Sequence, residues 1–256
     1  MAVEGPADTG GGEPADPVVS LCNAVFGWRP ETVLLDIPAL DVARGEKVFL
    51  RGPSGSGKSS LLGLLGGVLT ARSGSVRVLG EDLARLSGAQ RDALRAAHLG
   101  VIFQMFNLLP FLSLVDNVTL PCRFSAQRAG RLADAPGGID GEARRLLSRL
   151  GLDGDTVATT PVCELSVGQQ QRVAAARALI GGPALLIADE PTSALDTDAR
   201  DAFLSLLVEE CARFGSSLLF VSHDAGLAGH FDRTVDLAVL NRATGASASP
   251  GQEVRP

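Results

Sequence analysis

The glycine-rich segment from Gly52 to Ser59 carries the clearest chemistry in the sequence. It reads Gly-Pro-Ser-Gly-Ser-Gly-Lys-Ser, which matches the G-x-x-x-x-G-K-S/T pattern of loops that hold nucleotide phosphates. Glycines let backbone N–H groups approach phosphates closely, and a following helix points its positive end at the anion. Lys58 adds a cation for the β- and γ-phosphates, and the Ser59 hydroxyl is an oxygen ligand for Mg²⁺. The sequence therefore predicts these nucleotide-binding residues: Gly52, Pro53, Ser54, Gly55, Ser56, Gly57, Lys58, Ser59 and Ser60.

Two adjacent carboxylates, Asp189 and Glu190, follow the apolar run 185–188. Strand side chains alternate between faces, so neighbouring carboxylates serve different tasks. We expect Asp189 to orient a metal-bound water and Glu190 to polarise an attacking water as general base.

A second anion site is predicted at Ser166. Ser166 and Gln169 have the spacing of a capping box that opens an Ala-rich helix over 167–180. The first N–H groups of that helix and the Ser166 hydroxyl would attract an anion. A helix that is simply well capped has the same pattern, so this segment is ambiguous by itself.

Several motifs in order carry a resemblance to a known family. The segment Leu165-Ser-Val-Gly-Gln169 resembles the signature motif of ATP-binding subunits of ABC transporters, and it stands shortly before the acidic strand, as in that family. Gln104 follows a predicted strand, Ser-Ala-Leu-Asp occupies 193–196, and His223 follows an apolar run. The resemblance covers residues 18–241. It implies a P-loop NTPase core of the RecA type with a parallel sheet, an antiparallel β subdomain and a helical subdomain carrying the signature.

The resemblance implies roles for residues that the local patterns leave open. Gln104 would reach Mg²⁺ and the attacking water, and His223 would contact the γ-phosphate and help to place Glu190. Asp196 would lie at a dimer interface. The implied catalytic residues are Glu190, His223, Gln104 and Lys58, and the implied metal ligands are Ser59, Gln104 and Asp189.

Two positions differ from the family pattern. Trp28 is expected to stack on adenine where the family usually has Tyr, with Phe26 as the competing aromatic residue. Val167 stands where the signature usually has Gly. A β-branched residue is tolerated early in a right-handed helix but not at positive φ, so we expect ATP hydrolysis to survive, with altered turnover as an open outcome.

The resemblance also implies the assembly and the partners. The chain would pair head to tail with a second copy or a paralogous ATPase subunit, with ATP and Mg²⁺ held between the phosphate loop of one subunit and the signature of the other. The implied signature contacts to that ATP come from Leu165, Ser166, Val167, Gly168 and Gln169. An integral-membrane permease would contact the segment after Gln104 and attach the chain peripherally to the inner membrane. The amino-acid sequence of that segment resembles the lipoprotein-release and macrolide-export branch of the family.

The predicted elements alternate in the manner of an α/β protein with parallel strands. Strands are expected at 18–21, 33–42, 47–50, 75–79, 99–103, 185–188 and 217–221, and helices at 58–69, 142–150, 167–180 and 197–214. The segment 107–165 is predicted to be mostly helical, with a surface loop over 128–141. We expect a disordered leader at 1–17, an ATP-binding domain at 18–243 with its helical subdomain at about 106–168, and a disordered tail at 244–256.

Composition limits the alternatives. The 256 residues are 45% hydrophobic and 20% charged with a net charge of −6, which excludes wholesale disorder and disfavours a nucleic-acid partner. The longest apolar runs are too short to span a bilayer, the N-terminus lacks a secretory signal, and the four cysteines have no zinc spacing, so we expect a cytoplasmic protein.

Three other functions remain open at this stage. A soluble ABC-type ATPase acting on DNA or ribosomes typically carries two cassettes or a long coiled coil, and neither pattern is present here. A P-loop kinase or GTPase leaves Gln104, Asp196 and His223 unexplained. A catalytically dead subunit is disfavoured because Lys58, Glu190 and His223 are all present.

Overall fold

The computed structural model describes residues 16–152, 154–192, 195 and 197–245. Apart from residues 16–17 and 244–245, the predicted leader and tail lie outside these residues, and so does Asp196. The described residues form two sheets, one of antiparallel strands ordered β2-β1-β4-β5 and one of parallel strands ordered β6-β7-β8-β3-β9. Their bounds are β1 Val19–Phe26, β2 Leu35–Val42, β3 Lys47–Arg51, β4 Ser73–Val78, β5 Glu81–Asp82, β6 Leu99–Ile102, β7 Leu185–Asp189, β8 Ser217–Ser222 and β9 Arg233–Asp236.

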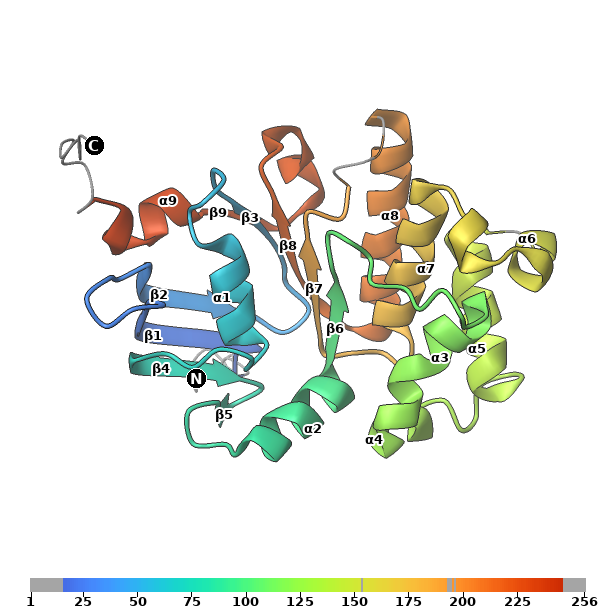
Figure 1. The fold of residues 1–256 in the computed structure, drawn as a ribbon, viewed down its shortest axis with the longest axis horizontal. Coiled ribbons are helices and arrows are strands. Elements are labelled where there is room, and N and C mark those ends of the chain that lie inside the picture. The colour runs from blue at the N-terminus through green and yellow to red at the C-terminus, as the bar shows by residue number, and fades with distance from the viewer. Residues whose placement is uncertain (1–15, 153, 193–194, 196, 246–256) are drawn as a thin grey trace, which may run out of the picture.

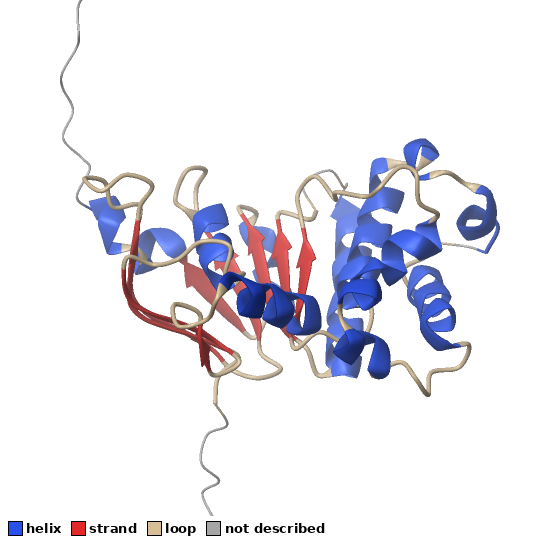
Figure 2. Ribbon diagram, turned by 60° about the horizontal axis from the view of Figure 1, so that its bottom comes forward, coloured by secondary structure: helices blue, strands red, loops and turns tan. Residues whose placement is uncertain are grey.

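Figure 1 shows the antiparallel strands on the left, the parallel sheet in the middle and helices α3 to α8 on the right. The α-helices are α1 Lys58–Leu65, α2 Gly88–His98, α3 Leu114–Phe124, α4 Ala126–Gly130, α5 Gly138–Arg149, α6 Gly154–Thr159, α7 Val167–Leu179, α8 Thr197–Phe214 and α9 Leu237–Leu240, and short 3₁₀ helices occupy η1 Val162–Glu164, η2 Ala225–His230 and η3 Arg242–Gly245. Figure 2 shows the same separation, with the helices gathered to one side of the strands. The predicted α/β class is therefore confirmed.

The parallel sheet brings the functional strand ends together. Strand β8 is buried at every position, and β7 at every position except its last, as expected for a parallel sheet covered on both faces. β8 pairs with both β3 and β7, with Arg51 opposite Ser222 and Asp189 opposite Val221. Parallel strands end at the same edge, so the loops after these strands meet there.

The antiparallel sheet packs against helix α1, which also contacts the parallel sheet. Its strands alternate buried and exposed positions, with Val19 and Leu21 among those facing the core. Leu61 and Leu64 of α1 belong to the same hydrophobic cluster as this face and as Leu50 of the parallel sheet. Helix α1 therefore joins the two sheets. Among the residues that the structure describes, no helix combines the length and apolarity needed to cross a membrane.

The predicted surface loop over 128–141 is too long. Residues 131–137 form turns and most of them are exposed, but helix α4 ends only at Gly130 and α5 begins at Gly138. Arg128 is only 2% exposed because its guanidinium donates hydrogen bonds to the carbonyls of Leu99 and Ala178. Burial lowers the pKa of Arg128 to about 10. An Ala-, Gly- and Arg-rich composition suggested solvent exposure for every residue of the segment, whereas these contacts bury Arg128 at its start.

Helix boundaries also differ from the predictions. Helix α1 was predicted to end at residue 69, but it ends at Leu65, and Gly66 is its C-cap. Helix α2 was not predicted, although Ser87 and Gln90 form a capping box with the same spacing as Ser166 and Gln169. The capping box was therefore a local signal for this helix.

Candidate functional site

The phosphate loop connects the end of β3 to the start of α1. Gly55 and Gly57 have φ values of 79° and 97°, which favour glycine, and a Cβ on Gly57 would lie 2.6 Å from the Leu35 side chain. No described side chain caps α1, and its first turn holds no acidic residue. The first N–H groups of α1 are therefore available to an anion.

Lys58 is buried and held inside this loop. Its Nζ donates to the carbonyls of Gly52 and Pro53 at 2.8 and 3.1 Å and lies 3.4 Å from Glu190 Oε1. The Ser56 hydroxyl is buried nearby and has no hydrogen-bonding partner among the described residues. A buried cation and an unpartnered hydroxyl beside free backbone donors suit a polyphosphate.

Asp189 supplies the carboxylate that a metal would need. The Ser59 hydroxyl lies 3.5 Å from Asp189 Oδ2 and donates to it. Burial, and then the charge of Glu190, raises the pKa of Asp189, so protons compete with a metal at higher pH than for an exposed aspartate. Mg²⁺ is usually bound by one or two protein oxygens together with phosphates and water. Ser59, Asp189 and Gln104 line one cavity and fit that donor set.

Glu190 lies between Lys58 and His223. Its Oε2 is 3.3 Å from His223 Nδ1, and its side chain is 18% exposed. The backbone φ of Glu190 is 45°, a left-handed conformation that costs a non-glycine residue about 1–3 kcal/mol. The hydrogen bond from its N–H to the Val221 carbonyl, at 2.9 Å, holds that conformation. This geometry directs a carboxylate into the cavity, where a general base is required.

These residues surround a cavity of about 370 Å³, lined by Leu34, Ser54, Gly55, Gly57, Lys58, Ser59, Ser60, Gln104, Asp189 and Glu190. Gly52 and Pro53 line a smaller neighbouring cavity together with His223. Leu34 was not predicted, because nothing in its local sequence marks an apolar residue as cavity-lining. The fold thus gathers Gln104, Asp189 and Glu190 around the phosphate loop.

The predicted adenine-stacking residue lies outside this lining. Trp28 is 69% exposed, and the edge of its ring system meets Phe26, with 5.2 Å between centroids and an interplanar angle of 81°. Phe26 is buried in the antiparallel sheet. The exposure of Trp28 and the burial of Phe26 favour Trp28 for stacking on a base.

The predicted signature forms the start of α7. Ser166 is the N-cap: its Oγ accepts from the Gln169 N–H at 3.3 Å, and its own N–H donates to Gln169 Oε1 at 2.9 Å. Val167 is 48% exposed, and a Cβ on Gly168 would meet Leu195 Cδ2 at 3.3 Å. None of the residues from Leu165 to Gln169 lines the nucleotide cavity of its own chain.

Sequence reasoning missed Arg177 of α7. Its guanidinium donates to the carbonyls of Phe106 and of Asn107, the latter at 2.7 Å. Both acceptor residues are in the left-handed region, with φ values of 56° and 51°. They follow Gln104 closely, so Arg177 holds the loop that carries Gln104. A charged residue inside the Ala-rich run of α7 was the signal available.

A larger groove of about 540 Å³ lies beside the same loop. It is lined by apolar side chains, among them Phe103, Leu120 and Phe124, and by the arginines Arg95, Arg128 and Arg177. Phe103 and Phe124 are 45% and 75% exposed, and Met105 and Phe111, in the segment after Gln104, are 82% and 79% exposed. The segment predicted to contact a permease therefore presents apolar surface.

Comparison with known proteins finds a matching family profile and similar sequences. The sequence profile described as ABC transporter matches residues 35–193. The lipoprotein-releasing system ATP-binding protein LolD 2 of Rhodospirillum rubrum is 42% identical over 78% of this chain and 83% of its own length. The macrolide export ATP-binding/permease protein MacB of Bradyrhizobium diazoefficiens is 39% identical over 88% of this chain. The chain spans about a third of the length of the MacB relatives.

Solved structures agree with the sequence relatives. The dimeric structure of MJ0796, a bacterial ABC transporter cassette, superposes with a TM-score of 0.75 and 32% identity, covering 85% of this chain and 93% of that one. A post-hydrolysis state of MJ0796 bound to ADP and Pi superposes with a TM-score of 0.74.

Proposed function

The chain belongs to the ABC transporter family, and we propose that it is the ATP-binding and ATP-hydrolysing subunit of a transporter whose membrane permease is a separate protein. The observation that carries the proposal is the position of Glu190, which lies within 3.4 Å of both Lys58 Nζ and His223 Nδ1 at the edge of the phosphate loop. That arrangement has a cation for the phosphates and a base for water in one cavity.

The residues of the cavity have different tasks in ATP hydrolysis. Lys58 and the α1 N–H groups bind the β- and γ-phosphates, and Trp28 stacks on the adenine. Glu190 takes a proton from the attacking water, and His223 holds Glu190 in place and contacts the γ-phosphate. Ser59, Asp189 and Gln104 would hold Mg²⁺, which neutralises charge on the phosphates when bound.

Two copies would complete the ATP site. The Ser166 end of α7 is exposed and does not line the cavity of its own chain. A head-to-tail pair brings that end to the γ-phosphate held by the other copy, with Asp196 at the interface. MJ0796, at 32% identity, forms a dimer. Hydrolysis would remove the phosphate that bridges the two copies.

The names of the relatives suggest the type of transport system. LolD 2 is named for lipoprotein release and the MacB relatives for macrolide export, and the latter combine an ATP-binding part with a permease in one chain. We propose a system of this type, with the chain in the cytoplasm and bound peripherally to the inner membrane through the permease at the 540 Å³ groove. The proposed ATP-binding domain is 18–243, with its helical subdomain at about 106–168.

The test is light scattering on the purified Glu190→Gln chain with and without ATP and Mg²⁺. A change from monomer to dimer only with ATP supports the proposal, because the trapped nucleotide bridges the copies. A monomer under both conditions, in a chain shown separately to bind ATP, would contradict ATP-driven pairing of this chain alone.

A further inference from the structure

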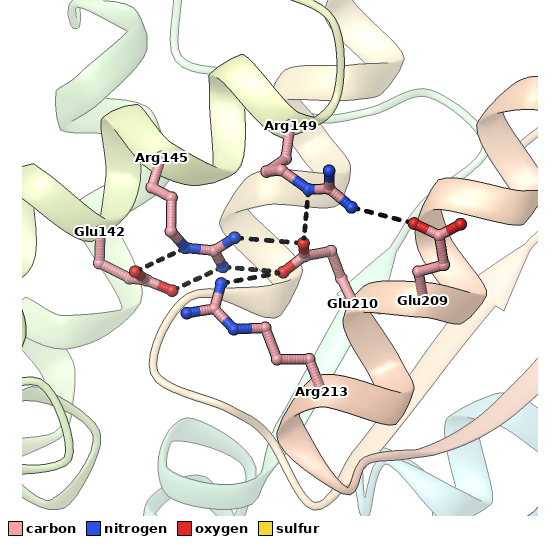
Figure 3. Close-up of polar contacts among 6 residues, drawn as sticks. All are labelled: Glu142, Arg145, Arg149, Glu209, Glu210 and Arg213. Atoms are coloured by element: carbon pink, nitrogen blue, oxygen red, sulfur yellow. Dashed lines mark hydrogen bonds and ion pairs between the residues drawn. The ribbon is translucent and has the colours of Figure 1, made fainter.

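A network of charged side chains joins helix α5 to helix α8 outside the nucleotide cavity (Figure 3). Arg145 lies at its centre. Its Nε and Nη2 donate to both carboxylate oxygens of Glu142, each at 2.8 Å, and its Nη1 and Nη2 donate to Glu210 at 3.1 and 2.7 Å. Arg149 donates to Glu210 at 3.3 Å and to Glu209 at 2.9 Å.

Both carboxylates that accept hydrogen bonds from Arg145 are buried. The side chains of Glu142 and Glu210 are 7% and 3% exposed, whereas Arg149 and Arg213 are about half exposed. Burial opposes the charge on Glu210, but hydrogen bonds from Arg145 and Arg149 outweigh it and lower its pKa. A buried carboxylate without its cation is strongly unfavourable, so the charged contact between α5 and α8 at Glu210 depends on Arg145.

The geometry of this contact sets an angle as well as a distance. Glu142 lies on α5 together with Arg145 and holds its guanidinium in place, and the two hydrogen bonds to Glu210 cross to α8. A guanidinium that donates two parallel hydrogen bonds to a carboxylate restricts the orientation of that carboxylate. Helices packed through apolar side chains, in contrast, can slide past one another by small amounts. The hydrogen bonds from Arg145 to Glu210 therefore restrain the position of α5 relative to α8.

A short path leads from α5 to the signature. The turn after α5 includes Gly151, whose carbonyl accepts a hydrogen bond from Arg172 at 3.2 Å. Gly151 has a φ of 81°, and a Cβ there would lie 2.6 Å from Arg172 Nη1. Arg172 belongs to α7, within two turns of Ser166. Helices α5 and α7 also share one hydrophobic cluster. The orientation of α5 is thereby passed to the start of α7.

We propose that Arg145 is a positioning residue for ATP-dependent dimerisation. By binding Glu142 and Glu210 together it fixes α5 and α7 relative to α8, and so places Ser166 and Gly168 where they meet the ATP of a second copy. This inference rests on the proposed function. It assigns no contact with ATP to Arg145 itself, whose effect passes through the helices.

The experiment compares four chains that all carry Glu190→Gln: the parent, Arg145→Gln, Arg145→Lys and Arg144→Gln. Arg144 is the neighbouring residue of the same helix, is exposed, and serves as the matched control. Two quantities are measured below the unfolding temperature of each chain. One is the affinity of the dilute monomer for ATP, and the other is the ATP concentration that gives half-maximal dimerisation by light scattering.

Arg145→Gln is expected to keep its monomer affinity for ATP within about twofold and to raise the ATP concentration for dimerisation at least about tenfold. Arg145→Lys keeps the charge without the fork and should lie between these values, and Arg144→Gln should match the parent. A purely structural role would lower the unfolding temperature and leave the dimerisation midpoint unchanged, which would overturn the proposal.

Arg145→Lys covers the case in which Arg145→Gln does not fold, because it keeps a cation beside the buried carboxylates and loses the two-pronged hydrogen bonding of the guanidinium. A rise of about threefold in its dimerisation midpoint, at unchanged monomer affinity for ATP, supports the proposal, and a midpoint equal to that of the parent overturns it. Arg149→Gln leaves the Arg145 hydrogen bonds in place and should keep the parent midpoint within about twofold. A parent chain that fails to dimerise would instead refute the proposed dimer, and this proposal with it, so the two failures are distinguishable.

Discussion

Helices α1 and α7 begin in opposite ways, although both are assigned to phosphate binding. The N-cap of α1 is Gly57 in a left-handed conformation, and no described side chain caps it. The N-cap of α7 is Ser166, which shares a complete capping box with Gln169. The N-terminus of α1 lies inside the cavity of its own chain, whereas that of α7 is exposed.

The difference shows which helix needs a ligand within the chain. The uncapped donors of α1 would be satisfied by the phosphates of a nucleotide in the cavity of the same chain. The first turn of α7 is already capped, and under the proposed function it would meet a phosphate only on a second copy. Helix α2 has the same capping box at Ser87 and Gln90 and lines no phosphate cavity among the described residues. A capping box alone therefore does not identify an anion site.

The largest expected effect tests whether hydrolysis occurs on the α1 side. Glu190→Gln should lower turnover about 1000-fold, because the amide cannot accept the proton of the attacking water, while ATP binding persists. Steady-state phosphate release and nucleotide binding measure the two effects. Glu81→Gln, an exposed glutamate of β5, is the control. Unchanged turnover in Glu190→Gln would remove Glu190 from the role of base.

Removal of the buried cation tests the α1 loop itself. Lys58→Ala should weaken ATP binding by about 100-fold or more, since the phosphates lose a desolvated charge partner. Calorimetric titration with ATP measures this. Lys47→Ala is a matched control, because Lys47 is also partly buried but pairs with Asp232 away from the cavity, at 4.0 Å. ATP affinity retained in Lys58→Ala would contradict the phosphate-loop assignment.

The two capping boxes allow a paired test of α7. Ser166→Ala and Ser87→Ala should each destabilise the chain by about 1 kcal/mol, because each removes an N-cap hydroxyl. Only Ser166→Ala, in the Glu190→Gln background, should raise the ATP concentration for dimerisation, by about tenfold. Thermal unfolding and light scattering measure the two effects. An equal shift of the dimerisation midpoint in both variants would mean that Ser166 acts only as a cap.

The smallest expected effect concerns the unusual signature residue. Val167 is half exposed, is the first residue of α7, and is not among the residues with positive φ, so its β-branch is unstrained. Val167→Gly should leave turnover within about twofold or raise it, and should cost the helix less than about 1 kcal/mol. ATP hydrolysis assays check this. A collapse of activity would show that the chain has adapted to valine.

The elements that the sequence predicts well are those with local signals. The glycines of 52–57 mark the phosphate loop, and the capping box at Ser166 marks the start of α7 at Val167. Arg128 shows why the start of the segment 128–141 was mispredicted. The composition of the segment suggests that its side chains are exposed to solvent, but the Arg128 guanidinium donates to the carbonyls of Leu99 and Ala178. An arginine in sequence carries no information about which distant carbonyl it reaches.

The sequence by itself determined the chemical groups: a glycine-rich loop with Lys58, a strand that ends in two carboxylates, and a capped helix with Ser166. Local geometry fixes each of these, because glycine conformation and N-capping depend on neighbouring residues. The tertiary structure alone decided that Lys58, Glu190 and His223 meet, through the parallel register of β3, β7 and β8. It alone joined Arg145 to Glu210, since pairing across a fold depends on packing and leaves no mark on local sequence.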